Sequence, residues 1–438
     1  MTTAALAALL CVGTFYRPAA AIAAALCLYG LKQWGQSSSA FFAQHRIVAN
    51  YLVASLVLYA LLVRARTGRV RMVRSRAWAC MLVLYGYAIA TLAWAPDLSV
   101  SIDWWLTQGP YIVLFGALIP MLIADSDDVV TAARWLIAVA AAIGLLALVF
   151  GHWGDRGLVL YGRNTTDVED TTNPLAIAQI GGYLFLAALL MLAQKRPLLV
   201  RATLLLAMSI GVALMLRSGS RGQLYAAAIC GIIAWPLTSR RIASSVFVSL
   251  PLVVLCTLIL GWEAWHYVVG TGAVVDRWTA VESSLAAEGR MNMGLDLART
   301  AFENPLTAIF GLGNSSSWHY LGIYTHITAM EVLAEEGLVG LAIYVLVIIA
   351  AIQECVLLAG KRNIGDSDRV RYSCALVVAL FFFELILSQK QGTLLGSYYV
   401  LCFIGVLGQL NSTMRAAQPE RLEPPLQVAP TPFPNLLR

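Results

Sequence analysis

Long apolar runs are the feature that most constrains this sequence. Predominantly apolar stretches recur along the whole 438-residue chain, and each can cross a hydrocarbon core of about 30 Å as a helix. Charged residues make up only 12% of the composition, whereas soluble chains contain about 25%. We therefore predict an all-α, polytopic membrane protein. The net charge of +6 reflects arginines in loops and does not indicate nucleic acid as a partner.

The apolar runs predict about twelve crossings. Residues 1–34 are interrupted at Arg17-Pro18 and form either one kinked span or two short segments; they are counted as one crossing. The other spans are expected near residues 47–63, 77–94, 109–124, 131–150, 174–193, 198–216, 221–238, 243–261, 328–358, 371–388 and 393–410.

Arginine-rich loops predict the orientation. Residues 64–76 hold six arginines, and positive charge in short loops is retained in the cytoplasm. Loops 194–201, 239–241 and 359–371 then fall on the same side and are also basic. With twelve crossings, both termini are expected in the cytoplasm. Loops 95–108, 151–173, 217–220, 262–325 and 389–392 are expected to face outward.

The segment "RSGSR" therefore places Arg217 and Arg221 outside, against the positive-inside trend. Arginines at membrane depth indicate a functional site. The alternative for each of them, and above all for Arg217, is snorkelling to lipid headgroups.

Two polar segments complete the organisation of the chain. Loop 262–325 contains "EGRMNMGLDLARTAFENPL", whose apolar residues recur at helical spacing until Asn304-Pro305. This pattern predicts an amphipathic helix on the outer face. Residues 411–438 are rich in proline and are expected to form a disordered cytoplasmic tail. The transmembrane domain is thus placed at residues 1–410.

Histidine and arginine are the candidates for chemistry on the outer face. His326 lies where the large loop enters a span, and Glu331, Glu335 and Glu336 follow it. His319 is its rival. Arginine forks suit phosphate oxygens, and histidine can accept a proton from a hydroxyl. Arg221, Arg290 and His326 together would suit the displacement of a diphosphate by an alcohol.

Three stretches resemble the O-antigen ligase family, which is related to the O-antigen polymerases and O-oligosaccharyltransferases. They are "SGSRG", "GRMNMGLDLARTAFENPLTAIFGLG" and "HITAMEVLAEEGLVG", and together they cover residues 217–340. The order in the family is an arginine, a helix ending before a proline, a glycine-rich turn, and a histidine followed by Glu-x-Gly-x-x-Gly. The "TAI" before "FGLG" and the Ile-Thr after His326 depart from this pattern.

The resemblance implies a GT-C-like glycosyltransferase of the bacterial inner membrane with a large periplasmic loop and a periplasmic active site. The donor would be polysaccharide on undecaprenyl diphosphate, and the acceptor would be lipid A–core. His326, Arg221 and Arg290 would be catalytic, and inversion is expected. Arg217, Glu335 and His319 are assigned to substrate binding, and Glu335 is expected to orient the helix entry or His326.

No metal or cofactor is predicted, because the outward acidic residues lack the spacing of metal ligands. Two alternatives to the ligase stay open. An O-antigen polymerase would use a second lipid-linked oligosaccharide as acceptor, and the motifs scarcely separate it from a ligase. A transporter of lipid-linked sugars would need charged residues within its spans. The spans predicted here are nearly uncharged, and Glu384 is the main exception.

Overall fold

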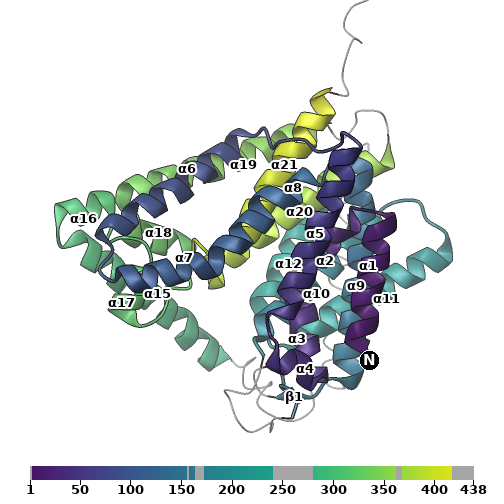
Figure 1. Ribbon diagram of the computed structural model, residues 1–438, viewed down its shortest axis with the longest axis horizontal. Helices are drawn as coiled ribbons and strands as arrows, with labels where there is room; N and C mark the ends of the chain where they lie inside the picture. Colours follow the sequence, from purple (N-terminus) through teal and green to yellow (C-terminus); the bar gives the residue numbers. More distant parts are fainter. Residues whose placement is uncertain (1, 155–156, 163–171, 240–279, 362–366, 417–438) are drawn as a thin grey trace, which may run out of the picture.

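The computed structural model describes residues 2–154, 157–162, 172–239, 280–361 and 367–416, and they fold almost entirely into helices (Figure 1). Seven described helical segments are long and apolar enough to cross a membrane. They are α5 (Val48–Arg66), α6 with η1 (Arg76–Trp94), α9 (Ser126–Phe150), α10 (Pro174–Leu192), α11 (Leu198–Arg217), α19 (Gly337–Lys361) and α20 (Asp368–Gln391). The helical class is confirmed, and seven is the number of spans that the described part of the chain supports.

The remaining elements are shorter or more polar. They are α1 (Thr2–Tyr16), α2 (Ala20–Leu26), α3 (Leu28–Ser38), α4 (Ala40–Gln44), α7 (Leu98–Val113), η2 (Leu114–Leu118), α8 (Ile119–Met121), α12 (Arg221–Ala234), η4 (Trp235–Thr238), α15 (Ala280–Phe302), α16 (Pro305–Phe310), α17 (Ser316–Leu321), α18 (Thr328–Glu335) and α21 (Tyr398–Ala416), with a two-stranded antiparallel pair, β1 (Trp153–Gly154) and β2 (Gly157–Leu158). The predicted span 243–261 lies outside the described residues.

The loops gather at two opposite ends of the bundle. At one end, which we call the arginine end, Arg64 forms an ion pair with Asp128, and Arg369 pairs with Asp127 at 3.1 Å. Gln194 there bonds the carbonyl of Asp368 at 2.8 Å. All these residues lie in or beside the loops predicted to be cytoplasmic.

The other end, the His326 end, joins the loops predicted to face outward. Gln33 bonds the carbonyl of Asn173 at 2.6 Å, and Gln223 bonds Gln391 at 2.9 Å. Thr328 bonds the carbonyl of Ser388 at 2.9 Å. The described parts of these loops therefore fall into the two predicted groups.

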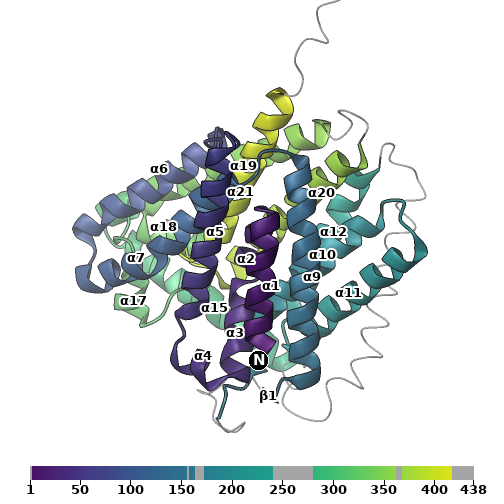
Figure 2. The ribbon, with the colours of Figure 1, turned by 45° about the vertical axis from the view of Figure 1, so that its right-hand side comes forward.

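The first 34 residues were wrongly counted as a single crossing. The Thr3 hydroxyl lies 3.0 Å from the Ser38 hydroxyl, so α1 runs antiparallel to α2 and α3. The cause lies at Arg17-Pro18, where α1 has ended and the Arg17 carbonyl accepts the N–H of Ala20 at 2.8 Å. The start of α1 consequently lies at the same end of the bundle as Ser38, as Figure 2 also shows.

Three predicted boundaries also need correction. The span at 328–358 is broken between α18 and α19, because Gly337 has a φ of +68°. The outer loop at 95–108 is largely helix α7, since Asp97 caps it by accepting the N–H of Val100 at 3.2 Å. Residues 411–416 belong to α21 and not to a tail.

Helices α10 and α20 form the centre of the bundle, with 83% and 78% of the most apolar stretch of each helix buried. Close packing of α10 on α11 depends on glycine. A Cβ at Gly181 would lie 2.6 Å from the carbonyl oxygen of Gly211, so small residues set the approach of these two helices.

Candidate functional site

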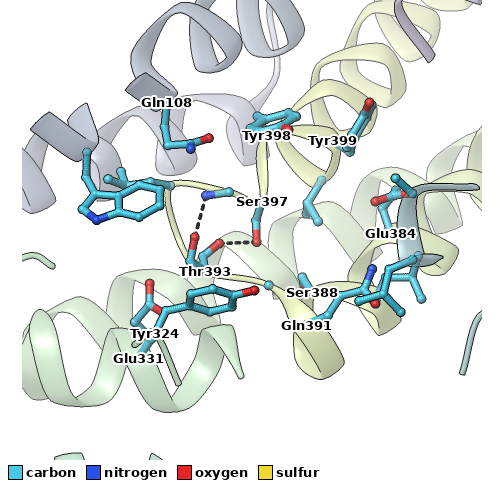
Figure 3. Close-up of a pocket in the computed structure, with 18 of the residues that line it drawn as sticks. Gln108, Tyr324, Glu331, Glu384, Ser388, Gln391, Thr393, Ser397, Tyr398 and Tyr399 are labelled. Atoms are coloured by element: carbon cyan, nitrogen blue, oxygen red, sulfur yellow. Dashed lines mark hydrogen bonds between the residues drawn. The ribbon is translucent and has the colours of Figure 1, made fainter. Parts of the chain in front are cut away.

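A cavity of about 380 Å³ lies at the His326 end, among α3, α7, α10, α18, α20 and the turn before α21 (Figure 3). Most of its hydrogen-bonding groups are uncharged; they include Gln33, Gln108, Asn173, Gln179, Ser315, Ser317, Ser388, Gln391, Thr393 and Ser397. The second kind of lining residue is aromatic: Tyr29, Trp104, Trp318, Tyr324, Tyr398 and Tyr399. The lining also contains three carboxyl groups, those of Glu331, Glu335 and Glu384.

The glutamates of helix α18 form hydrogen bonds with the backbone of two walls of this cavity. The carboxylate of Glu335 accepts the backbone N–H of Ser315 at 2.7 Å and that of Ser317 at 2.9 Å. On the other wall, Glu331 accepts the N–H of Leu394 at 2.9 Å. The three glutamates of "EVLAEEG" are thus anchors for neighbouring loops, and Glu335 orients the turn before α17.

Glycines let the turn at 311–313 approach the end of α18. The N–H groups of Leu312 and Gly313 donate to the carbonyls of Ala334 and Glu335, each at 2.9 Å. Gly311 has a φ of +88°, and a Cβ there would lie 2.0 Å from the Glu335 carbonyl oxygen. The carbonyls at the end of a helix need such donors, which explains the spacing between "GLG" and "EEG".

Asn314 completes this junction, and all its polar atoms are bonded. Its backbone N–H donates to Thr91 at 3.0 Å and its backbone carbonyl accepts from Ser101 at 2.8 Å. Its side chain donates to Glu336 at 2.7 Å and accepts from Trp105 at 3.0 Å. A buried, fully satisfied amide of this kind fixes the position of the loop that carries it.

Burial raises the pKa of all three α18 carboxyl groups. It raises the pKa of Glu335 to about 7, although the N–H groups of Ser317 and Ser315 act in the opposite direction. The pKa values of Glu331 and Glu336 are raised well above the ordinary value, first by burial and then by the charge of Glu335.

Cationic side chains converge beside the cavity. The Arg290 guanidinium donates to the Lys390 carbonyl at 3.5 Å, and the Lys390 ammonium donates to Gln223 at 3.1 Å. The charges of both Arg290 and Arg221 act on that ammonium. We call Arg221, Arg290 and Lys390 the cation cluster. Among the described residues, no carboxylate forms an ion pair with Arg290 or Lys390.

His326 lies next to this cluster. Its ring is 4.1 Å from that of Tyr324, which lines the cavity. Burial and then the positive charge of Arg290 lower the pKa of His326 below its ordinary 6.5. The imidazole is therefore neutral at pH 7 and can accept a proton. Its φ of +65° is costly for a residue with a side chain, so the surrounding contacts hold it in place.

The other predicted residues lie apart from the cluster. Arg217 ends α11, with its guanidinium carbon 5.9 Å from the centre of the Trp153 ring. His319 is exposed on α17, with its ring 5.0 Å from that of Tyr320, and it does not line the cavity. The structure thus brings together Arg221, Arg290 and His326, and it leaves Arg217 and His319 outside.

Lys390 was not among the predicted site residues. A usable signal was present, because loop 389–392 was expected to face outward and Lys390 is a cation within it. The cavity itself had no such signal. Three of its five amide side chains, those of Gln33, Gln108 and Gln179, are about 70 residues apart in the sequence and belong to three different helices.

No protein-family model matches the chain, and no curated protein matches it either. Among the described residues, no group of three or more histidine, cysteine or acidic side chains is arranged to hold a metal ion. The groups that could act on a ligand at this end are the cation cluster, His326 and the polar side chains of the cavity.

Proposed function

We propose that this protein is a membrane glycosyltransferase of the O-antigen ligase type. In this proposal it transfers polysaccharide from undecaprenyl diphosphate to lipid A–core at the periplasmic face of a bacterial inner membrane. The observation that carries the proposal is the cation cluster beside a neutral His326 at the edge of a polar cavity. The resemblance of residues 217–340 to that family adds the identity of donor and acceptor.

An anion of high charge density would relieve the cluster electrostatically. Like charges held close together repel, and a bound anion removes that cost. A diphosphate carries enough oxygens for several charge-assisted hydrogen bonds from Arg221, Arg290 and Lys390. These groups would stabilise the charge that develops on a departing lipid diphosphate, which is often the largest contribution to such catalysis.

His326 supplies the group that the acceptor needs. An acceptor hydroxyl attacks the anomeric carbon of the first donor sugar, the bond to the diphosphate oxygen breaks, and the hydroxyl proton passes to the imidazole. Attack from the side opposite the leaving group gives inversion. The positive charge of the cluster takes the place that a divalent ion holds in other diphosphate chemistry, so transfer is expected to persist in excess chelator.

The decisive experiment is reconstitution of the purified protein with a lipid-linked donor and one of two acceptors. Formation of polysaccharide-bearing lipid A–core supports a ligase, whereas chain extension on a second lipid-linked donor supports a polymerase. Transbilayer movement of the donor without any product would support a transporter.

The Lys390→Met variant should weaken diphosphate binding by about 10-fold or more, since a charge-assisted hydrogen bond contributes about 1.5–3 kcal/mol.

A further inference from the structure

We infer that the cavity binds the donor sugar attached directly to the diphosphate, and that Glu384 anchors this sugar. The inference rests on the proposed function and adds a saccharide subsite to it. Its starting point is a carboxylate inside a span, which neither the cation cluster nor His326 accounts for.

Glu384 lines the cavity, and only 5% of its surface is exposed. One of its oxygens accepts the Tyr183 hydroxyl at 2.5 Å and the Gln179 amide at 2.7 Å. Among the described residues no cation pairs with it. A buried carboxylate is costly unless further donors satisfy it, so a ligand group in the cavity that donates hydrogen bonds would stabilise this arrangement.

The rest of the lining indicates what kind of ligand donates them. Neutral amides and hydroxyls around Glu384 suit a molecule with many hydroxyl groups and no charge. The Trp104 and Trp318 rings stack at 4.9 Å, and Tyr324 lies 6.1 Å from Trp318. A wall of aromatic faces with a few placed polar groups is typical of small-ligand sites of roughly 300–1,000 Å³. A sugar ring presents both an apolar face and polar edges, and so matches both kinds of lining.

The cavity is also in the correct place for the first sugar. Gln391 lines it and accepts a hydrogen bond from Gln223, which in turn accepts one from the Lys390 ammonium. Tyr324 lines it as well and contacts His326. Cavity and cation cluster therefore share a boundary, and a sugar bonded to a diphosphate at the cluster would extend across that boundary. Figure 3 shows Tyr324 and Glu384 on different sides of the cavity.

The test measures sugar binding and diphosphate binding separately, in the full-length protein in nanodiscs. The sugar probes are methyl glycosides of N-acetylglucosamine, galactose and rhamnose, followed by saturation-transfer NMR and titration. We expect at least one probe to bind the wild-type protein with a millimolar Kd. Glu384→Leu and Gln108→Ala should each weaken it by about 10-fold or more, and Glu384→Gln should weaken it less, as expected for loss of charge-assisted hydrogen bonds.

Two controls give the result its meaning. Glu354→Gln changes another buried glutamate in a span, which bonds Asn411 at 2.6 Å and does not line the cavity, and sugar binding should not change. Binding of undecaprenyl diphosphate should persist in Glu384→Leu and fall in Arg290→Gln. The saccharide subsite is overturned if no probe binds, or if the Gln108 and Glu384 variants bind as the wild type does. If the affinity for undecaprenyl diphosphate is the same in Arg290→Gln as in the wild type, the result would instead contradict the proposed function.

Discussion

His326 is the residue on which proton transfer would depend. Replacing it with alanine is expected to lower the rate of glycosyl transfer by about 10²–10⁴-fold, the range for loss of a well-placed general base. Donor binding should be almost unchanged, because the cation cluster is intact. The measurement is product formation in the reconstituted system, with donor affinity determined in parallel.

The matched control for this change is His319→Ala. His319 is exposed on α17 and does not itself line the cavity, so its loss should leave transfer within about 2-fold of wild type. Equal losses in the two variants would contradict the assignment of His326 as the base.

The pH dependence of the reaction follows from the lowered pKa of His326. Below that pKa the imidazole carries a proton and cannot accept another, so the transfer rate should fall only at a pH more acidic than an ordinary histidine would require. The charge of Arg290 is the second cause of the shift, after burial. In Arg290→Gln the pKa should therefore rise toward its ordinary value, which histidine NMR resonances of labelled protein can follow. A pKa that stays the same in this variant would contradict the proximity of the two side chains.

Helix α18 is the element that positions the loops around the cavity. Its backbone carbonyls accept hydrogen bonds from the loop at 311–313. Its glutamate side chains accept hydrogen bonds from the backbone N–H groups of Ser315, Ser317 and Leu394. Because both neighbouring loops line the cavity, the helix sets the separation of the two walls. The arrangement of the two walls thus depends on a helix of only eight residues.

Gly311→Ala tests this junction. The added Cβ would meet the Glu335 carbonyl, and a φ of +88° is unfavourable for alanine. We expect the free energy of unfolding to fall by at least about 2 kcal/mol, together with a loss of transfer activity. Gly289→Ala is the control, because a Cβ at Gly289 meets nothing within 4 Å. Thermal unfolding in detergent would measure both variants, and equal midpoints would argue against the tight approach.

Glu335→Gln tests the buried carboxylate. In the folded protein its pKa is raised to about 7 from the ordinary 4.5. Stability from this shift is therefore complete below 4.5 and is lost as the pH rises through 7. The variant lacks an acceptor for one N–H group, so it should be less stable than wild type at pH 6. The difference should shrink by pH 8.5, and thermal midpoints at the two pH values measure it. A difference that widens with pH would contradict the raised pKa.

The sequence was sufficient to predict those helices and helix ends that depend on local chemistry. Apolar length predicted most spans, and Asn304-Pro305 correctly marked the end of a helix, since α15 stops at Phe302 and Asn304 caps α16. The return of α1 on α3 was not predicted, because a Pro break in an apolar run is compatible with a kink or a reversal. Tertiary contacts such as Thr3 with Ser38 decide between the two.

At the scale of the whole molecule, the contacts between loops determine on which end each terminus lies. The end of α21 lies at the arginine end, where Gln409 bonds the carbonyl of Arg71 at 3.2 Å and Lys361 bonds the carbonyl of Asn411 at 3.0 Å. The start of α1 lies with Ser38, and α5 crosses the bundle between that end and the loop that begins at Arg64. The two termini of the described chain are therefore at opposite ends of the bundle, whereas the predicted topology placed both on the same side.

This arrangement predicts the accessibility of two epitope tags. If the arginine-rich loop 64–76 is retained in the cytoplasm, a tag after residue 438 should react with antibody only in permeabilised cells. A tag before Thr2 should react in intact spheroplasts, because it lies at the His326 end. A tag inserted after Gly322, which is exposed on the loop beside α17, serves as the reference for that end and should behave like the N-terminal one. Protection of the N-terminal tag alone would contradict the antiparallel arrangement of α1 and α3, and with it the placement of Thr2 at the His326 end.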